Sequence, residues 1–107
     1  MRTCGATPGG PDLAGVDLTS QAVIQGAVLR SGVSDGVPNG SPVDNAYVRL
    51  LDSNGEFTAE VPTNLEGQFR FFAAPGTWTV VVLAHGAREE IKVQAEKGTP
   101  VDLVIQI

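Results

Sequence analysis

Residues 67–82 read GQFRFFAAPGTWTVVV, and this stretch decides the fold of the chain. Apolar residues alternate on both sides of the pair Pro75-Gly76, as they do on one face of a pleated strand. Phe69, Phe71 and Ala73 come before the pair, and Trp78, Val80 and Val82 come after it. Pro has no backbone N–H and Gly accepts backbone angles that other residues resist, so the pair predicts a tight turn. Four of the six aromatic residues lie here, which predicts that this hairpin forms the centre of the core.

Alternating apolar residues predict five further strands, at residues 21–30, 46–52, 56–61, 90–95 and 101–107. In the strand at 56–61 the alternation predicts that Phe57, Ala59 and Val61 face inward. Turn-forming residues separate the strands, and no segment shows helical periodicity. Together with the hairpin this gives seven strands, so the pattern predicts an all-β fold, a seven-stranded β-sandwich.

Two segments lack this alternation. Residues 1–20 contain a Gly- and Pro-rich run, so we expect a flexible N-terminal tail before a single domain at residues 21–107. Residues 31–45 hold several Gly and Pro residues, which predict a loop. Long loops are often functional or mobile, so ligand binding by this loop is one functional hypothesis, based on its length alone.

The composition argues against several classes of function. The 107 residues carry a net charge of −5 and only seven scattered Lys and Arg residues, so we expect no nucleic-acid binding. No apolar run reaches the ~18 residues of a membrane span, and the first residues lack the apolar region of a secretory signal. We therefore expect a cytoplasmic protein that does not bind a membrane. A single Cys excludes an internal disulfide and a metal site built on Cys pairs.

A second set of apolar residues has the parity opposite to the core: Tyr47, Leu51, Phe72, Val81, Leu83 and Val104. If several of them lie on one sheet, they form an exposed apolar patch, and large patches of this kind mark interfaces. Our candidate interaction face, for a partner protein or a homodimer, consists of Tyr47, Leu51, Phe72, Val81 and Leu83. The alternative is that the tail or the long loop covers these side chains.

Four blocks of the sequence, taken in order, resemble the carboxypeptidase regulatory-like domains. They are Ile24-x-Gly26-x-Val28, Pro42-Val43-x-Asn45-Ala46-x-Val48-x-Leu50, Thr63-Asn64-x-Glu66-Gly67-x-Phe69-x-Phe71 and Ala74-Pro75-Gly76-Thr77-Trp78-Thr79-Val80. The resemblance implies a transthyretin-like (prealbumin-like, Ig-like) seven-stranded sandwich. It implies little about activity, because such domains are attached to many unrelated functions.

A narrower resemblance covers residues 46–52, 56–61 and 67–78, together with the pair Cys4-Gly5. These segments look like a small actinobacterial family of unknown function, whose members are often described as sulfur-metabolism proteins and found beside thiosulfate sulfurtransferases (rhodaneses). The resemblance implies a non-catalytic accessory protein that acts with such a sulfurtransferase. The long loop at residues 31–45 departs from the family, which usually has a short turn there.

Cys4 is the one candidate for chemistry. A cysteine in a mobile Gly-rich tail is accessible, and its thiolate is a sulfur nucleophile. Beside a rhodanese, Cys4 would serve as a persulfide acceptor. The competing interpretation is an incidental cysteine, because the sequence places no helix N-terminus or His nearby to activate the thiol. The protein would then be an interaction or scaffold module that uses its apolar face and no thiol chemistry.

The remaining polar residues predict no enzyme, no metal site and no cofactor. His85, the only histidine, lies in a predicted turn, which is typical of solvated surface rather than of a metal ligand or general base. No nucleophile elbow, phosphate loop or Cys/His catalytic set is present. Arg49, Glu60 and Arg70 have outward parity on neighbouring predicted strands, so we expect cross-strand ion pairing there.

Overall fold

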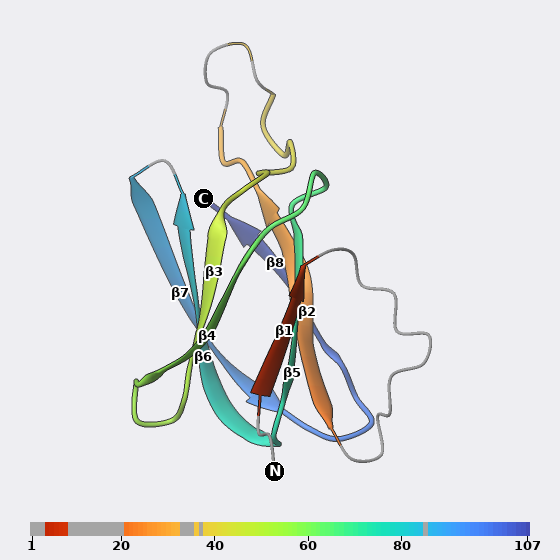
Figure 1. Cartoon of the computed structure of the whole chain (residues 1–107). Coiled ribbons are helices and arrows are strands. Elements are labelled where there is room, and N and C mark those ends of the chain that lie inside the picture. The colour runs from red at the N-terminus through yellow and green to blue at the C-terminus, as the bar shows by residue number, and fades with distance from the viewer. Residues whose placement is uncertain (1–3, 9–20, 33–35, 37, 85) are drawn as a thin grey trace.

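The computed structural model describes the backbone of residues 4–8 and the whole of residues 21–32, 36, 38–84 and 86–107 (Figure 1). These residues form eight strands: β1 (Cys4–Pro8), β2 (Ala22–Leu29), β3 (Tyr47–Leu51), β4 (Phe57–Pro62), β5 (Gln68–Ala73), β6 (Gly76–Ala84), β7 (Ala87–Ala95) and β8 (Val101–Gln106). Within these described ranges, no helix is long and apolar enough to cross a membrane.

The strands form two four-stranded sheets, ordered β1-β5-β2-β8 and β4-β3-β6-β7. Paired strands run antiparallel, except that β2 and β8 are parallel. The sheets lie as two layers in Figure 1, and the edge strand β1 lies close to the edge strand β4 of the other sheet. The described chain is therefore an all-β protein with sandwich-like layering, and each of the seven predicted strands has a counterpart among β2 to β8.

The aromatic hairpin lies in the core, as predicted. Phe69 and Phe71 are fully buried on β5, with ring centroids 6.1 Å apart and an interplanar angle of 56°. Trp78 on β6 is 7 % exposed, and its indole Nε1 donates a hydrogen bond of 2.9 Å to the carbonyl oxygen of Ala74. That bond satisfies the polar atom of the indole, so the ring is buried without an orphaned donor.

The N-terminal segment differs from the predicted tail. Residues Cys4–Pro8 form β1, which pairs with β5 from Cys4 opposite Ala73 to Pro8 opposite Phe69. The prediction of an unstructured tail over residues 1–20 is therefore wrong for these five residues, and residues 1–3 and 9–20 lie outside the described part. The physical reason is that β5 has a second edge with free N–H and C=O groups, which a short strand can satisfy. Pairing of this kind leaves no local signal in a Gly- and Pro-rich sequence.

A β-bulge reverses the predicted orientation of Phe57. On β4, Ala59 lies opposite Leu50 of β3 but Phe57 lies opposite Leu51, so Thr58 is the extra residue. An inserted residue moves every side chain beyond it to the other face of the sheet. Phe57 is 62 % exposed as a result, and the prediction that it faces inward is wrong, whereas Val61 is buried as predicted.

The segment that leads into β3 is held by one buried side chain. Thr63, which is 4 % exposed, donates its hydroxyl to the Val43 carbonyl oxygen at 2.6 Å and accepts from the Ala46 amide at 2.9 Å. The base of the preceding loop is also tied, because the amide of Arg30 donates to the Ser41 carbonyl at 2.8 Å. These bonds fix the entry of the chain into β3, where the candidate interaction face begins.

Candidate functional site

The outer face of the sheet β4-β3-β6-β7, which points away from the other sheet, carries most of the predicted interaction residues. Tyr47 lies directly opposite Leu83 across β3 and β6, and Leu51 lies on the same face of β3. Tyr47 is 51 % exposed, and Leu51 and Leu83 are partly buried. The structure therefore places these three side chains on one face of the sheet, as the parity of the sequence predicts, with Arg49 between Tyr47 and Leu51.

Phe57 completes this surface, and the sequence pattern missed it. The bulge places Phe57 opposite Leu51, and the Arg49 guanidinium carbon lies 5.8 Å from the centroid of its ring. A cation at this distance from an aromatic ring is attracted to the face of the ring, by about 0.5–1 kcal/mol at an exposed site. The alternation from Phe57 to Val61 hides the extra residue, so only the strand register reveals the orientation of this ring.

Val81 belongs to the same face but is not available for contact. It is 1 % exposed, although it points away from the core. Its register partners are Arg49 on β3 and Glu90 on β7, two long side chains. The aliphatic stems of such side chains cover neighbouring apolar surface while their charged ends remain in water. The prediction that Val81 is an exposed contact residue is therefore wrong.

Phe72 does not belong to this face. It lies on β5, in the sheet β1-β5-β2-β8, opposite Val23 of β2, and it is partly buried. The five predicted residues thus divide between two sheets, because parity tells which face of a strand a residue occupies but not which sheet holds the strand. We use the name outer apolar face below for Tyr47, Leu51, Phe57 and Leu83.

Two ion pairs lie on the same side of the sheet as the outer apolar face. Arg49 donates from Nε and Nη2 to Glu60 Oε2 at 3.1 and 3.0 Å, which confirms the predicted cross-strand pair. Arg88 and Glu90 form a second pair on β7. Exposed pairs of this kind contribute about 0–1 kcal/mol to stability. Arg49 lies between Tyr47 and Leu51 on β3, so the first pair separates Tyr47 and Leu83 from Leu51 and Phe57. The second pair lies on the edge strand β7.

Arg70 does not lie on the sheet that holds Arg49 and Glu60. It is 6 % exposed and lies on β5 in the other sheet, where its Nε donates to Gln25 Oε1 at 3.3 Å. Gln25 in turn donates from Nε2 to Asp102 Oδ1 at 2.9 Å. These three residues link β5, β2 and β8 across one face of the sheet. Buried polar groups that are hydrogen-bonded in this way hold strands in register, so we assign the chain of bonds a structural role.

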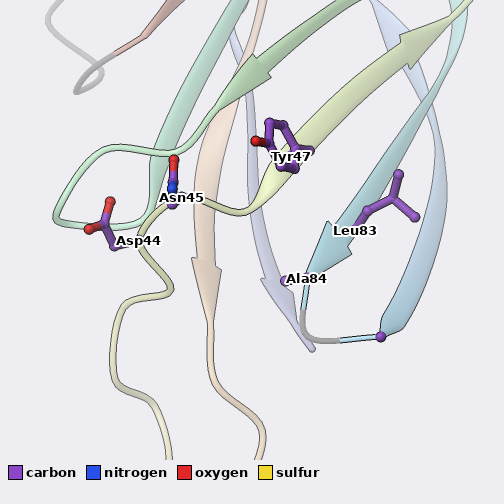
Figure 2. A pocket seen from close by; sticks show the side chains of 6 residues that line it. Asp44, Asn45, Tyr47, Leu83 and Ala84 are labelled. Atoms are coloured by element: carbon purple, nitrogen blue, oxygen red, sulfur yellow. The ribbon is translucent and has the colours of Figure 1, made fainter.

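A shallow cavity of about 430 Å³ lies beside the outer apolar face. Figure 2 shows Asp44, Asn45 and Tyr47 along the segment that leads into β3, and Leu83 and Ala84 near the end of β6. Asn45 has a φ of 63°, a left-handed conformation that Asn tolerates better than most residues. The cavity offers one carboxylate, one amide and one phenol, and it extends the apolar face at the end of the sandwich.

The structure bears little on Cys4, the one candidate for chemistry, or on His85. The backbone of Cys4 stands opposite Ala73 at the edge of a sheet, and its side chain lies outside the described residues. His85 also lies outside them. Across the part of the chain that the structure describes, no group of three or more His, Cys, Asp or Glu side chains is placed to hold a metal ion.

Comparisons with known proteins identify the family. At the level of structure, the chain is similar to part of a 9R-lipoxygenase from Cyanothece PCC8801, with a TM-score of 0.51 and 10 % identity over 98 % of this chain and 19 % of that one. This likeness concerns the fold alone.

The sequence is 50 % identical to an uncharacterized protein of Mycolicibacterium smegmatis over 80 residues, which are 75 % of this chain and 81 % of the relative. Two uncharacterized proteins of Mycobacterium tuberculosis strain H37Rv are each 48 % identical over 81 residues, which are 76 % of this chain and 74 % of each relative. Residues 4–107 match the model of a family described as protein of unknown function DUF1416. The chain therefore belongs to the DUF1416 family.

Proposed function

We propose that this chain is a non-catalytic accessory protein that binds a partner protein through its outer apolar face. The observation that carries the proposal is the exposure of two aromatic side chains, Tyr47 at 51 % and Phe57 at 62 %, on one face of one sheet. Aromatic residues are enriched at protein interfaces because they bury a large area and lose little side-chain entropy. The Arg49–Glu60 pair lies between the two apolar pairs of this face, so it favours a partner whose contact surface has two apolar patches with a polar group between them.

The partner we propose is a thiosulfate sulfurtransferase, and this rests on the resemblance of residues 46–52, 56–61 and 67–78 to the sulfur-metabolism family. In the same proposal Cys4 accepts sulfur. Its thiolate attacks the terminal sulfur of the enzyme persulfide, the sulfur–sulfur bond of the enzyme breaks, and the enzyme cysteine leaves as a thiolate. The product is a persulfide on Cys4, with a mass gain of about 32 Da. The reaction belongs in the cytoplasm, where thiols stay reduced.

The fold proposal that accompanies this function is a transthyretin-like sandwich of the carboxypeptidase regulatory-like type. It is supported by the seven strands β2 to β8 in two sheets and by the positions of the resemblance blocks, which lie on or directly before β2, β3, β5 and β6. A crystal structure whose strands β2 to β8 failed to superpose on such domains would contradict it.

The binding experiment uses the purified protein and a purified thiosulfate sulfurtransferase from the same organism, with calorimetry as the readout. We expect Tyr47→Ser and Phe57→Ser each to raise the Kd by about tenfold or more, which is about 1.4 kcal/mol. Val104→Ser is the matched control, because Val104 is 70 % exposed on β8 of the other sheet and should bind like the wild type. Wild-type protein that fails to bind the enzyme would refute the proposed partner.

A mass measurement separates the thiol chemistry from the binding. After incubation with the sulfurtransferase and thiosulfate, we expect the ~32 Da gain on the wild type and none on Cys4→Ser. If the enzyme is loaded with sulfur but Cys4 gains no mass, the acceptor role is wrong. If Cys4→Ser keeps full binding in that case, the protein is an interaction module without thiol chemistry.

A further inference from the structure

The strand β8 (Val101–Gln106) is an edge strand, and no described strand pairs with its outer side. Two of the other three edge strands differ from it. The edge strand β7 carries Arg88, Glu89, Glu90 and Lys92, and β4 has a bulge and lies close to β1. Charges, bulges and covering strands are the usual means by which proteins prevent edge-to-edge pairing. In β8 the only charged residue is Asp102, and Val104 is 70 % exposed.

The hydrogen bonds at the end of β8 show which backbone groups face the open edge. Ile107 donates its amide to the Leu29 carbonyl at 3.0 Å and accepts at its own carbonyl from the Ser31 amide at 2.9 Å. In a parallel ladder both groups of alternate residues bond to the same neighbour. Leu103 and Ile105 therefore also bond toward β2. The N–H and C=O groups of the intervening residues, Asp102, Val104 and Gln106, point away from it.

We propose that two copies of this chain pair through β8, antiparallel and about a two-fold axis at Val104. In this register Val104 lies opposite Val104 of the second copy, and Asp102 lies opposite Gln106. All three outward-facing residues of each strand then form hydrogen-bonded pairs with the other copy. A register centred on Leu103 would instead bring Gln106 opposite Pro100, which has no N–H to donate.

The side chains support the same register. Asp102, Val104 and Gln106 are all exposed on one face of the strand, and Leu103 and Ile105 lie on the core side. The pairing places a carboxylate opposite an amide that can donate to it, and it covers the exposed Val104 with its own copy. A register centred on Asp102 would oppose two carboxylates, which is destabilising. The result is an isologous dimer in which two four-stranded sheets become one sheet of eight strands.

The experiment measures the mass of the protein by sedimentation over about 1 µM to 1 mM, a range that covers weak specific association. We expect a wild-type dimer, and we expect Val104→Lys to raise its dissociation constant by about tenfold or more, because two like charges then face each other. Val104→Pro removes only an outward amide, so it should have the same effect while the β2–β8 ladder remains intact. Phe57→Lys is the control on the other sheet and should dimerise like the wild type.

Two variants with opposite charges at residue 104 test the proposed register directly. Val104→Lys and Val104→Glu should each dimerise about tenfold or more weakly than the wild type, and an equal mixture should recover the dimer as a mixed species, since residue 104 faces its own copy. Wild-type protein that stays monomeric throughout the range would overturn the proposal. A dimer that persists in Val104→Pro but dissociates in Phe57→Lys would place the contact on the outer apolar face and would also overturn it.

Discussion

Replacing Thr63 with Val is the sharpest test of how the segment before β3 is held. The change keeps the shape of the side chain but removes a hydroxyl that donates to the Val43 carbonyl at 2.6 Å and accepts from the Ala46 amide at 2.9 Å. Both partners belong to residues that are 1–2 % exposed. An orphaned buried polar group costs about 1–3 kcal/mol, and the change orphans two, so we expect a loss of about 2–6 kcal/mol in the free energy of unfolding. That is a large fraction of the stability of a small domain.

Thermal unfolding measures this loss. An unfolding entropy of about 2.1 cal/mol/K per residue gives about 0.22 kcal/mol/K for 107 residues, so the Tm should fall by about 9–27 °C. Thr63→Ser is the matched control, because it keeps the hydroxyl and loses one methyl group, at a cost of about 1 kcal/mol. Hydrogen exchange should also show that the Ala46 amide loses protection in Thr63→Val alone. A loss below about 0.5 kcal/mol in Thr63→Val, or equal losses in both variants, would refute the reasoning.

Two further predictions concern the turns and the surface. Gly67→Ala should cost more than about 2 kcal/mol in urea unfolding, because Gly67 has a φ of 74° and an added Cβ would lie 2.5 Å from the Val28 carbonyl oxygen. Gly55→Ala, at a φ of 82° with open space around it, should cost only about 1 kcal/mol, and equal costs would rule out the clash. For Arg49 and Glu60, a double-mutant cycle should give a coupling below about 1 kcal/mol that falls as salt is added. A larger, salt-independent coupling would show that the pair is not an ordinary surface pair.

The core residues of the hairpin and three surface residues of the candidate site could be predicted from the sequence, because strand alternation is a local property. Phe69, Phe71 and Trp78 are buried where their parity places them, and Tyr47, Leu51 and Leu83 share a surface for the same reason. Burial of alternate apolar side chains follows from the geometry of a single strand, whichever strands lie beside it. The aromatic hairpin and the Gly and Pro turns are sufficient to define an all-β chain of at least seven strands.

Strand pairing between distant segments decided which sheet holds each strand and which residues lie opposite one another. Register and sheet membership are not local properties, so the sequence pattern does not show them. Strand pairing placed Phe72 in one sheet and Val81 in the other, and it joined Cys4–Pro8 to β5. The bulge at Thr58 turned Phe57 outward and so created the most exposed aromatic ring of the candidate site. The sequence alone thus determines the alternating residues that form the centre of the core. The tertiary structure determines where a bulge or a neighbouring strand changes that burial, as at Phe57 and Val81, and which of the remaining apolar residues share a surface.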